Sequence, residues 1–261
     1  MQKARVENKL IPWRFADHIQ THSGQVNVST LIGAATAASQ KASFALGVTM
    51  IRNRVETLMS GREEKEELAR ERFCVIMRGA VRVKIGEIEH RLNTFDCLYA
   101  PIGTTYLIGE ADGQEAIFFW VFAPPFSDPK SKVSPTEEKN ARIVRLQDVS
   151  PSVFFDVPPD RRTSYEMIRG ANFSVGLVRR PSGAYGPLHI HDPPDSEEAY
   201  VAIQGTLQIT GLTGVADVLQ PFDGLYVPPF GGNSNRNIGH DECVYAYVEY
   251  PAVGIKEIPV N

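Results

Sequence analysis

The sequence predicts an all-β protein built as two tandem barrels. Short segments rich in Val, Ile, Phe and Tyr, such as FCVIM and AYVAIQG, recur between Gly, Pro, Asn and Asp, whereas helical periodicity is scarce. Regularly spaced strands of this kind are typical of a β-sandwich or barrel. The second observation is an internal repeat, and the third is a polar segment between its two copies. One stretch, SGREEKEELARERF at residues 60–73, could form a helix or a charged loop.

The repeat joins two different motifs at nearly the same spacing. RFCVIMRGAVRVKIG from Arg72 aligns with EAYVAIQGTLQITGL from Glu198 at an offset of 126 residues. LYAPIGTTY from Leu98 aligns with LYVPPFGGN from Leu225 at an offset of 127. Two motifs at almost one offset indicate a duplicated β-domain.

The repeat divides the chain into four parts. Residues 1–41 form an N-terminal extension, which we expect to pack across the other domain or a second subunit. Residues 42–126 form the first barrel, and residues 170–261 form the second. Between them, residues 127–169 are the linker and connecting segment. Its first part, SDPKSKVSPTEEKNARIV, is polar and contains proline, as a connection between compact units should be.

The composition excludes several classes of protein. The 261 residues carry a formal net charge of −4, and Lys and Arg are scattered, so no nucleic-acid partner is expected. The start of the chain has no apolar leader, and the longest apolar run, AIFFWVFAPPF, is too short to span a bilayer. Three widely spaced cysteines argue against a disulfide framework. We expect a cytoplasmic protein without a membrane partner.

The stretch GAYGPLHIHDPPDSEEAYVAIQG carries the strongest chemical signal. His189 and His191 are two positions apart, so on a strand both imidazoles face the same side of the sheet. Glu198 begins the next strand, which ends at a hairpin turn near Gly205. Two histidines and a carboxylate form an open ligand set for one divalent transition metal, Mn, Fe, Ni or Zn.

These residues resemble the first motif of the cupin superfamily, G(X)5HXH(X)3-4E(X)6G. Every spacing matches except one, because the six residues DPPDSE separate His191 from Glu198 instead of three or four. The insertion leaves Glu197 and Asp195 as alternative acids, but Glu198 fits the spacing to Gly205 and is preferred.

The second cupin motif, G(X)5PXG(X)2H(X)3N, is similar to FDGLYVPPFGGNSNRN. Pro228 and Asn237 match, whereas Asn233 stands in the histidine position. An amide oxygen binds such cations more weakly than an imidazole does, so Asn233 or water is expected to fill a fourth position. After a one-residue shift Ser234 or Asn235 could take that place, and a structural role for Asn233 is also open.

The first barrel lacks these residues. The offsets place Glu63 and Lys65 at the HxH positions, Arg72 at the glutamate position and Tyr106 at the histidine position of the second motif. The resemblance therefore implies a bicupin in which the first barrel is a cupin without metal and the second one binds it. This plan is similar to that of the (S)-ureidoglycine aminohydrolases, which have glutamine at the position of Asn233, and more loosely to the 5-keto-4-deoxyuronate isomerases.

Other residues are candidates for handling a small-molecule substrate. Tyr200 shares the face of Glu198 by strand alternation and could donate a hydrogen bond or a proton, although strand tyrosines mostly serve packing. Arg179 or Arg180 could clamp a carboxylate, although one of two adjacent strand residues must face away. The resemblance also implies a homodimer.

Three functions fit these residues. In the first, the metal acts as a Lewis acid in non-redox isomerase or aminohydrolase chemistry on a keto acid, sugar acid or ureido acid. In the second, the same ligand set serves an Fe(II) dioxygenase. In the third, the protein is a non-catalytic small-molecule-binding cupin, which the missing histidine of the second motif favours and the open metal face argues against.

Overall fold

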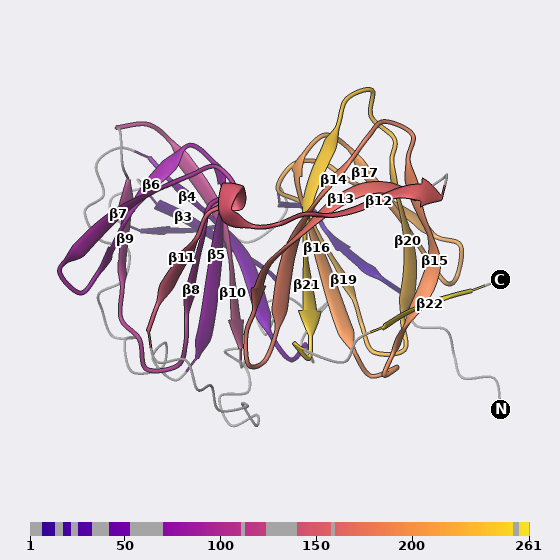
Figure 1. The fold of residues 1–261 in the computed structure, drawn as a ribbon, viewed down its shortest axis with the longest axis horizontal. Coiled ribbons are helices and arrows are strands. Elements are labelled where there is room, and N and C mark those ends of the chain that lie inside the picture. The colour runs from indigo at the N-terminus through magenta and orange to yellow at the C-terminus, as the bar shows by residue number, and fades with distance from the viewer. Residues whose placement is uncertain are drawn as a thin grey trace. The chain divides into compact units, whose positions relative to one another are not determined.

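The described chain is built almost entirely of β-strands (Figure 1), which confirms the predicted all-β class. The structure is a computed structural model that describes residues 7–13, 18–21, 26–32, 42–52, 70–110, 113–123, 140–157, 160–252 and 256–260. Helical segments within these ranges are too short to cross a bilayer. Most of the helix or charged loop considered for residues 60–73 lies outside the described residues, and its last three residues begin a strand.

The chain divides into two compact units. The N-terminal unit holds residues 16–149 and 170–172, and the C-terminal unit holds residues 1–15, 150–169 and 173–261. Of the connecting segment expected over 127–169, residues 150–169 belong to the C-terminal unit. Residues 152–169 contain two strands, because backbone pairing with the strand that follows adds them to a sheet of the C-terminal unit.

The N-terminal unit contains a seven-stranded and a three-stranded antiparallel sheet. In spatial order the larger sheet runs β11 (Arg142–Val144), β8 (Cys97–Ala100), β5 (Glu71–Arg78), β10 (Ala116–Ala123), β4 (Ala45–Ile51), β3 (Val26–Ile32) and β2 (His18–Thr21). The smaller sheet runs β7 (Ile88–Asn93), β6 (Ala80–Ile85) and β9 (Leu107–Glu110).

The C-terminal unit has the same plan with further strands. Its larger sheet runs β1 (Lys9–Ile11), β19 (Gly224–Val227), β16 (Glu197–Gln204), β21 (Cys243–Tyr250), β14 (Ser174–Arg180), β13 (Asp160–Arg169) and β12 (Ser152–Val157). Its smaller sheet runs β18 (Ala216–Leu219), β17 (Leu207–Gly211), β20 (Gly232–Asn237), β15 (Tyr185–Asp192) and β22 (Lys256–Pro259).

The order of the strands bears out the sequence repeat. The run β8, β5, β10, β4 in one unit corresponds to β19, β16, β21, β14 in the other, and β7, β6, β9 corresponds to β18, β17, β20. The aligned motifs begin at Arg72 in β5 and at Glu198 in β16, so equivalent sequences form equivalent strands.

Each unit buries its own apolar core between its sheets. The N-terminal core includes Ile76, Val83 and Trp120, and the C-terminal core includes Ala202, Ile209 and Leu225. Strand alternation fills these cores, because every second residue of a strand points to the same side of its sheet.

The start of the chain is attached to the C-terminal unit. Strand β1 pairs with β19, and Leu10 packs against the core. The backbone N–H of Trp13 donates to Asp223 at 2.8 Å. Strand β1 of the predicted extension therefore serves as an edge strand in the unit that carries the two histidines.

The predicted hairpin at Gly205 is present and requires glycine. Gly205 has a φ of 76°, and a Cβ there would lie 3.0 Å from the backbone of Cys243. Its counterpart in the repeat, Gly79, has a φ of 77°. Residues other than glycine rarely adopt this conformation, so both copies of the repeat have the same glycine-dependent turn.

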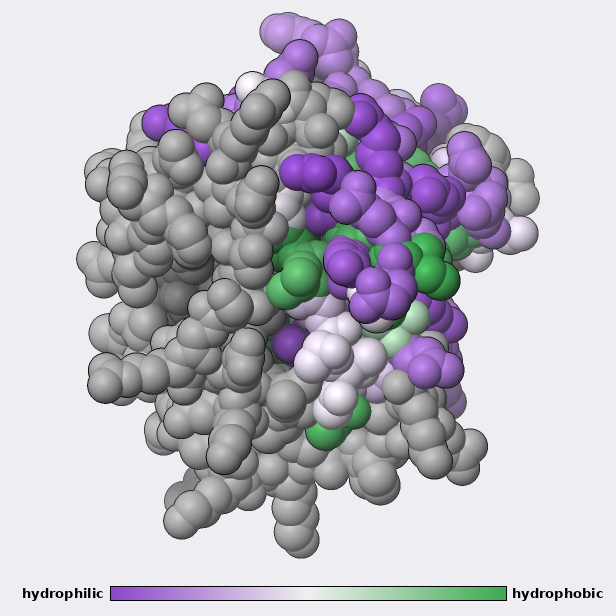
Figure 2. Space-filling model, turned by 90° about the vertical axis from the view of Figure 1, so that its left-hand side faces the viewer, coloured by the Kyte–Doolittle hydropathy of each residue, from purple (hydrophilic) through white to green (hydrophobic). Residues whose placement is uncertain are grey.

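Figure 2 looks onto the side of the molecule that carries β6, β7 and β9, where the described residues are mainly hydrophilic with small apolar areas. The exposed large hydrophobic residues of these strands are Ile88 and Leu107. This surface follows from the alternation in β6 and β7, which bury one face and expose polar residues on the other.

Candidate metal centre

Strand β15 directs both histidines to the interior of the C-terminal barrel. His189 and His191 are only 3% and 5% exposed, whereas Ile190 between them faces the other side and is partly exposed. This alternation is what the HxH spacing predicts. On either side, β20 and β22 pair with β15 and fix it, with His189 opposite both Asn233 and Pro259.

Glu198 faces the histidines from β16, and its neighbour Glu197 does not. The Glu198 Oε2 lies 3.5 Å from Nε2 of His191. Glu197 points to the opposite face of the strand and accepts a 2.7 Å hydrogen bond from the Tyr226 hydroxyl. In the N-terminal unit, Glu71 likewise accepts a 2.8 Å hydrogen bond from Tyr99. Glu197 therefore repeats a structural pair of the other barrel.

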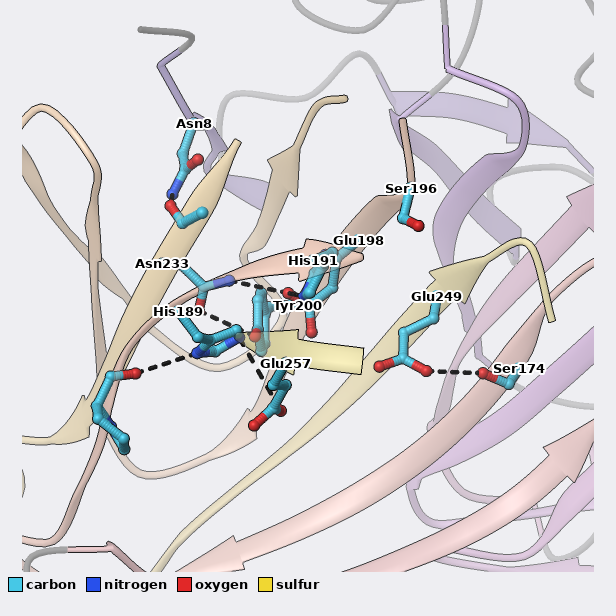
Figure 3. A network of polar contacts seen from close by, with 12 residues as sticks. Asn8, Ser174, His189, His191, Ser196, Glu198, Tyr200, Asn233, Glu249 and Glu257 are labelled. Atoms are coloured by element: carbon cyan, nitrogen blue, oxygen red, sulfur yellow. Dashed lines mark hydrogen bonds and ion pairs between the residues drawn. The ribbon is translucent and has the colours of Figure 1, made fainter. Parts of the chain in front are cut away.

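The three side chains form a compact donor set (Figure 3). One ligand atom from each of His189, His191 and Glu198 lies within 4.8 Å of the other two. The Nδ1 of His189 lies 3.0 Å from the Pro187 carbonyl oxygen, which fixes the proton on Nδ1 and leaves the Nε2 lone pair available. Within the described part of the chain, both buried Nε2 atoms lack a hydrogen-bond partner. Buried polar atoms are normally satisfied, so the donor set fits a divalent metal.

The electrostatics of the cluster favour the same interpretation. Burial lowers the pKa of His191, which keeps its imidazole neutral and able to donate a lone pair. Burial also raises the pKa of Glu198 to about 7, with His189 acting in the opposite direction. A buried carboxylate of this kind is costly to ionise without a cation nearby, and a bound metal would supply one.

Asn233 and Tyr200 lie beside the cluster as a hydrogen-bonded chain. The Asn233 amide nitrogen donates to Glu198 Oε2 at 2.9 Å, and its Oδ1 accepts from the Tyr200 hydroxyl at 3.0 Å. Both ends of the amide are therefore bonded to side chains. In this arrangement Asn233 orients Glu198, and Tyr200 orients Asn233.

The arginine predicted to handle substrate points away from the site. Arg179 is partly exposed, and its Nε lies 3.9 Å from Glu242 at the surface. Alternation along β14 turns Val178 and Arg180 inward instead, and Arg179 is not among the residues that line the adjoining cavity. Arg180 is fully buried and donates to the Tyr245 hydroxyl at 3.3 Å.

A polar cavity of about 220 Å³ opens beside the cluster. Glu198, Tyr200 and Asn235 line it, together with residues for which the sequence gives no earlier indication: Ser152, Arg162, Ser164, Glu166, Val178, Tyr245, Tyr247, Glu249 and Glu257. The alternation of Tyr245, Tyr247 and Glu249 along β21 could have been found by period two. Glu257 gives no such signal, because only the return of β22 to the edge of β15 brings it to the site.

Comparison with known proteins gives the fold. No family model matches the chain, and no curated protein matches its sequence. Solved structures do match: an oxalate decarboxylase from Lactobacillus farciminis in a formate complex is 15% identical, with a TM-score of 0.72 over 99% of this chain and 90% of that one. A glyoxylate-induced protein from Pseudomonas aeruginosa is 13% identical, with a TM-score of 0.72 over 100% of this chain and 95% of that one.

The chain has the bicupin fold. A 7S globulin from Momordica charantia also matches this bicupin, at 10% identity and a TM-score of 0.69 over 96% of this chain and 86% of that one. Since a decarboxylase and a globulin share the architecture, the fold leaves the reaction open.

The first barrel of the bicupin differs at the equivalent position. Arg72 replaces the carboxylate of Glu198, and its guanidinium lies 4.9 Å from the centre of the Tyr106 ring. Tyr106 stands where the second motif would have histidine. In the first barrel a guanidinium and an aromatic ring in cation–π contact therefore occupy the positions that hold Glu198 and Asn233 in the second barrel. Glu63 and Lys65, at the HxH positions, lie outside the described residues.

Proposed function

We propose that the C-terminal barrel binds one divalent transition metal through His189, His191 and Glu198 and acts on a small oxygen-rich molecule in the adjoining cavity. The observation that carries this proposal is the convergence of two buried Nε2 atoms, which lack hydrogen-bond partners in the described chain, on a buried carboxylate. Mn, Fe, Ni and Zn all suit these donors. When bound, the metal would supply Lewis-acid stabilisation of an oxyanion or enolate.

The chain's own side chains suggest how a substrate would be handled. Asn233 and Tyr200 hold Glu198 in place. Tyr245, Tyr247 and Glu249 line the cavity and could orient a polar substrate. Because Asn233 stands in place of a further histidine, we favour non-redox isomerase or aminohydrolase chemistry.

The proposal is tested by the metal content of the purified full chain. Elemental analysis of protein prepared without chelator or affinity-tag metal should give about one equivalent of Mn, Fe, Ni or Zn. The variant His189→Ala/His191→Ala should lose it, because removing both imidazoles leaves a single carboxylate. His240→Ala is the matched control, since His240 is exposed in a loop away from the cluster and its loss should leave metal content unchanged. A wild-type chain that contains no metal and takes none up on titration would contradict the proposal.

An Fe(II) dioxygenase is the second candidate, because two histidines and a carboxylate are also the ligands of non-haem iron oxygenases. Turnover of the metal-loaded protein on keto acids, sugar acids and ureido acids, with and without oxygen, separates the two. An isomerase or aminohydrolase runs anaerobically with Mn, Ni or Zn, whereas a dioxygenase consumes oxygen and requires iron. A ligand that raises the melting temperature without any product would favour a non-catalytic binding protein.

A further inference from the structure

The cavity beside the candidate metal centre is strongly acidic. Four carboxylates line it, those of Glu166, Glu198, Glu249 and Glu257, against the single guanidinium of Arg162. Together with Arg169, which pairs with Glu166, two guanidiniums stand against the four carboxylates, so two negative charges are in excess when all four are ionised. A divalent ion at the cluster would offset these two charges, and whether the cavity favours a cation then depends on how each carboxylate is engaged.

The carboxylates differ in how they are already engaged. Glu198 belongs to the metal cluster, and Glu257 lies 3.5 Å from the Nη2 of Arg162. Glu166 pairs with Arg169 at the surface, where both side chains are about half exposed. These three groups therefore have cationic or potential metal partners.

Glu249 is engaged differently. Its Oε2 accepts a 3.1 Å hydrogen bond from the Ser174 hydroxyl, which anchors the side chain at the end of β21. The other oxygen points away from Ser174 toward the side of the site on which Glu257 lies (Figure 3). Among the described residues, no Lys or Arg lies within ion-pair distance of Glu249, and the charge of Arg169 acts on it from farther away. It is a fixed carboxylate with an open oxygen on the cavity.

Three tyrosines also line the cavity, beside Ser152, Ser164, Val178 and Asn235. The tyrosines are Tyr200, Tyr245 and Tyr247. The ring of Tyr247 lies against Gly176, where a Cβ would overlap it, so the backbone of β14 holds this ring in position. The face of an aromatic ring attracts a cation, and a phenol hydroxyl can accept a hydrogen bond from an ammonium group as well as donate one, so these tyrosines are compatible with a cation.

From this arrangement we propose that the substrate carries a protonated nitrogen, an ammonium or amidinium group, and that Glu249 receives it while Tyr247 flanks it. The proposal rests on the proposed function only in taking this cavity as the substrate site. It narrows the substrate classes, because a keto acid or sugar acid without nitrogen would bring only negative charge to Glu249. It favours a molecule whose oxygen functions face His189, His191 and Glu198 and whose nitrogen faces β21.

The test uses three probes of similar size and different charge on the full chain at pH 7.5. These are 4-aminobutan-1-ol, which is a cation, 1,4-butanediol, which is neutral, and 4-hydroxybutanoate, which is an anion. Dissociation constants are measured by calorimetry or ligand-detected NMR, on chelator-treated and on metal-loaded protein. The cation should bind about tenfold or more tightly than the neutral probe, since a charge-assisted hydrogen bond replaces a neutral one. Equal binding of the cation and the diol by the wild type would overturn the proposal without any variant.

Glu249→Gln keeps the shape of the side chain and an acceptor for Ser174 but removes the charge. It should abolish the preference for the amine and leave metal content at the wild-type level. The matched control is Glu242→Gln, an exposed glutamate near Arg179 and outside the cavity, which should keep the preference. A Glu249→Gln protein that still prefers the amine would contradict the assignment of this residue. Metal uptake without amine preference would overturn only this inference, whereas amine preference without metal uptake would overturn only the proposed function.

Discussion

Asn233 shows how one residue can depart from a motif and still serve the site. Its amide bridges Glu198 and Tyr200, with both polar atoms bonded to these side chains. Hydrogen-bond partners of this kind set the orientation of a ligand without contacting the metal. The residue therefore has a positioning role in the geometry, next to the three side chains proposed as metal ligands.

Replacing Asn233 should weaken metal binding without abolishing it. We expect Asn233→Ala to lower the affinity about tenfold to a hundredfold, the usual effect of losing such a partner, while the stoichiometry stays at one. Asn233→Asp should also weaken it, because a second carboxylate would repel Glu198. Asn235→Ala is the control, since Asn235 lies two residues along the same strand and bonds to Tyr245. Titrations that show tighter binding by Asn233→Asp would instead identify residue 233 as a ligand.

At the scale of elements, the pairing of β14 with β21 shapes the wall of the cavity. Gly176 lies directly opposite Tyr247 in this ladder, and the phenol ring covers the glycine. No larger residue fits at position 176 unless the ring moves. Because Gly176 has no side chain, it leaves the space on β14 that the ring of Tyr247 occupies.

Gly176→Ala should displace Tyr247 and destabilise the C-terminal unit by about 1–3 kcal/mol, which is typical of overpacking. The measurement is the free energy of unfolding of this variant in two backgrounds. When Tyr247 is replaced by Ala, the ring is absent and the cost of Gly176→Ala should almost vanish. An equal cost in both backgrounds would mean that the glycine is needed for its backbone and not for the ring.

At the scale of the whole molecule, the candidate site concentrates buried negative charge in one of two related units. Burial raises the pKa of Glu249 to about 7, and the nearby Glu198 acts in the same direction. A carboxyl group whose pKa is higher in the folded than in the unfolded protein binds more protons when folded. Stability therefore falls as pH rises from about 4.5 to about 7.

This linkage predicts a pH-dependent gain from Glu249→Gln in chelator-treated protein. Relative to wild type, the variant should gain up to about 3 kcal/mol between pH 4 and pH 8, since a shift of one pKa unit corresponds to about 1.4 kcal/mol. Hydrogen exchange of amides in β16 and β21 across a urea series reports on the C-terminal unit itself. A difference between variant and wild type that does not change with pH would show that Glu249 has the same pKa in both states.

Much of the fold followed from local patterns. The alternation of apolar residues and the glycine at position 205 are local in the sequence, and the offsets of 126 and 127 residues follow from comparing the chain with itself. The strands that these features predict are present in equivalent order. The side on which His189 and His191 lie follows from the period of two in a strand, which needs no knowledge of neighbouring strands.

The remaining features depend on contacts between distant parts of the chain. The sequence by itself determined that two histidines share one face of a strand in a duplicated β-domain, with an acidic residue at the start of the next strand. Only the tertiary structure decided between Glu197 and Glu198, turned Arg179 outward, and added residues 150–169 and β1 to the second unit. It alone brought Glu249 from β21 and Glu257 from β22 to the same cavity. The physical reason is that the two-residue period of a strand determines which face of the sheet a side chain lies on. Strand register and sheet order pair distant parts of the chain, and they determine which residues that side chain contacts.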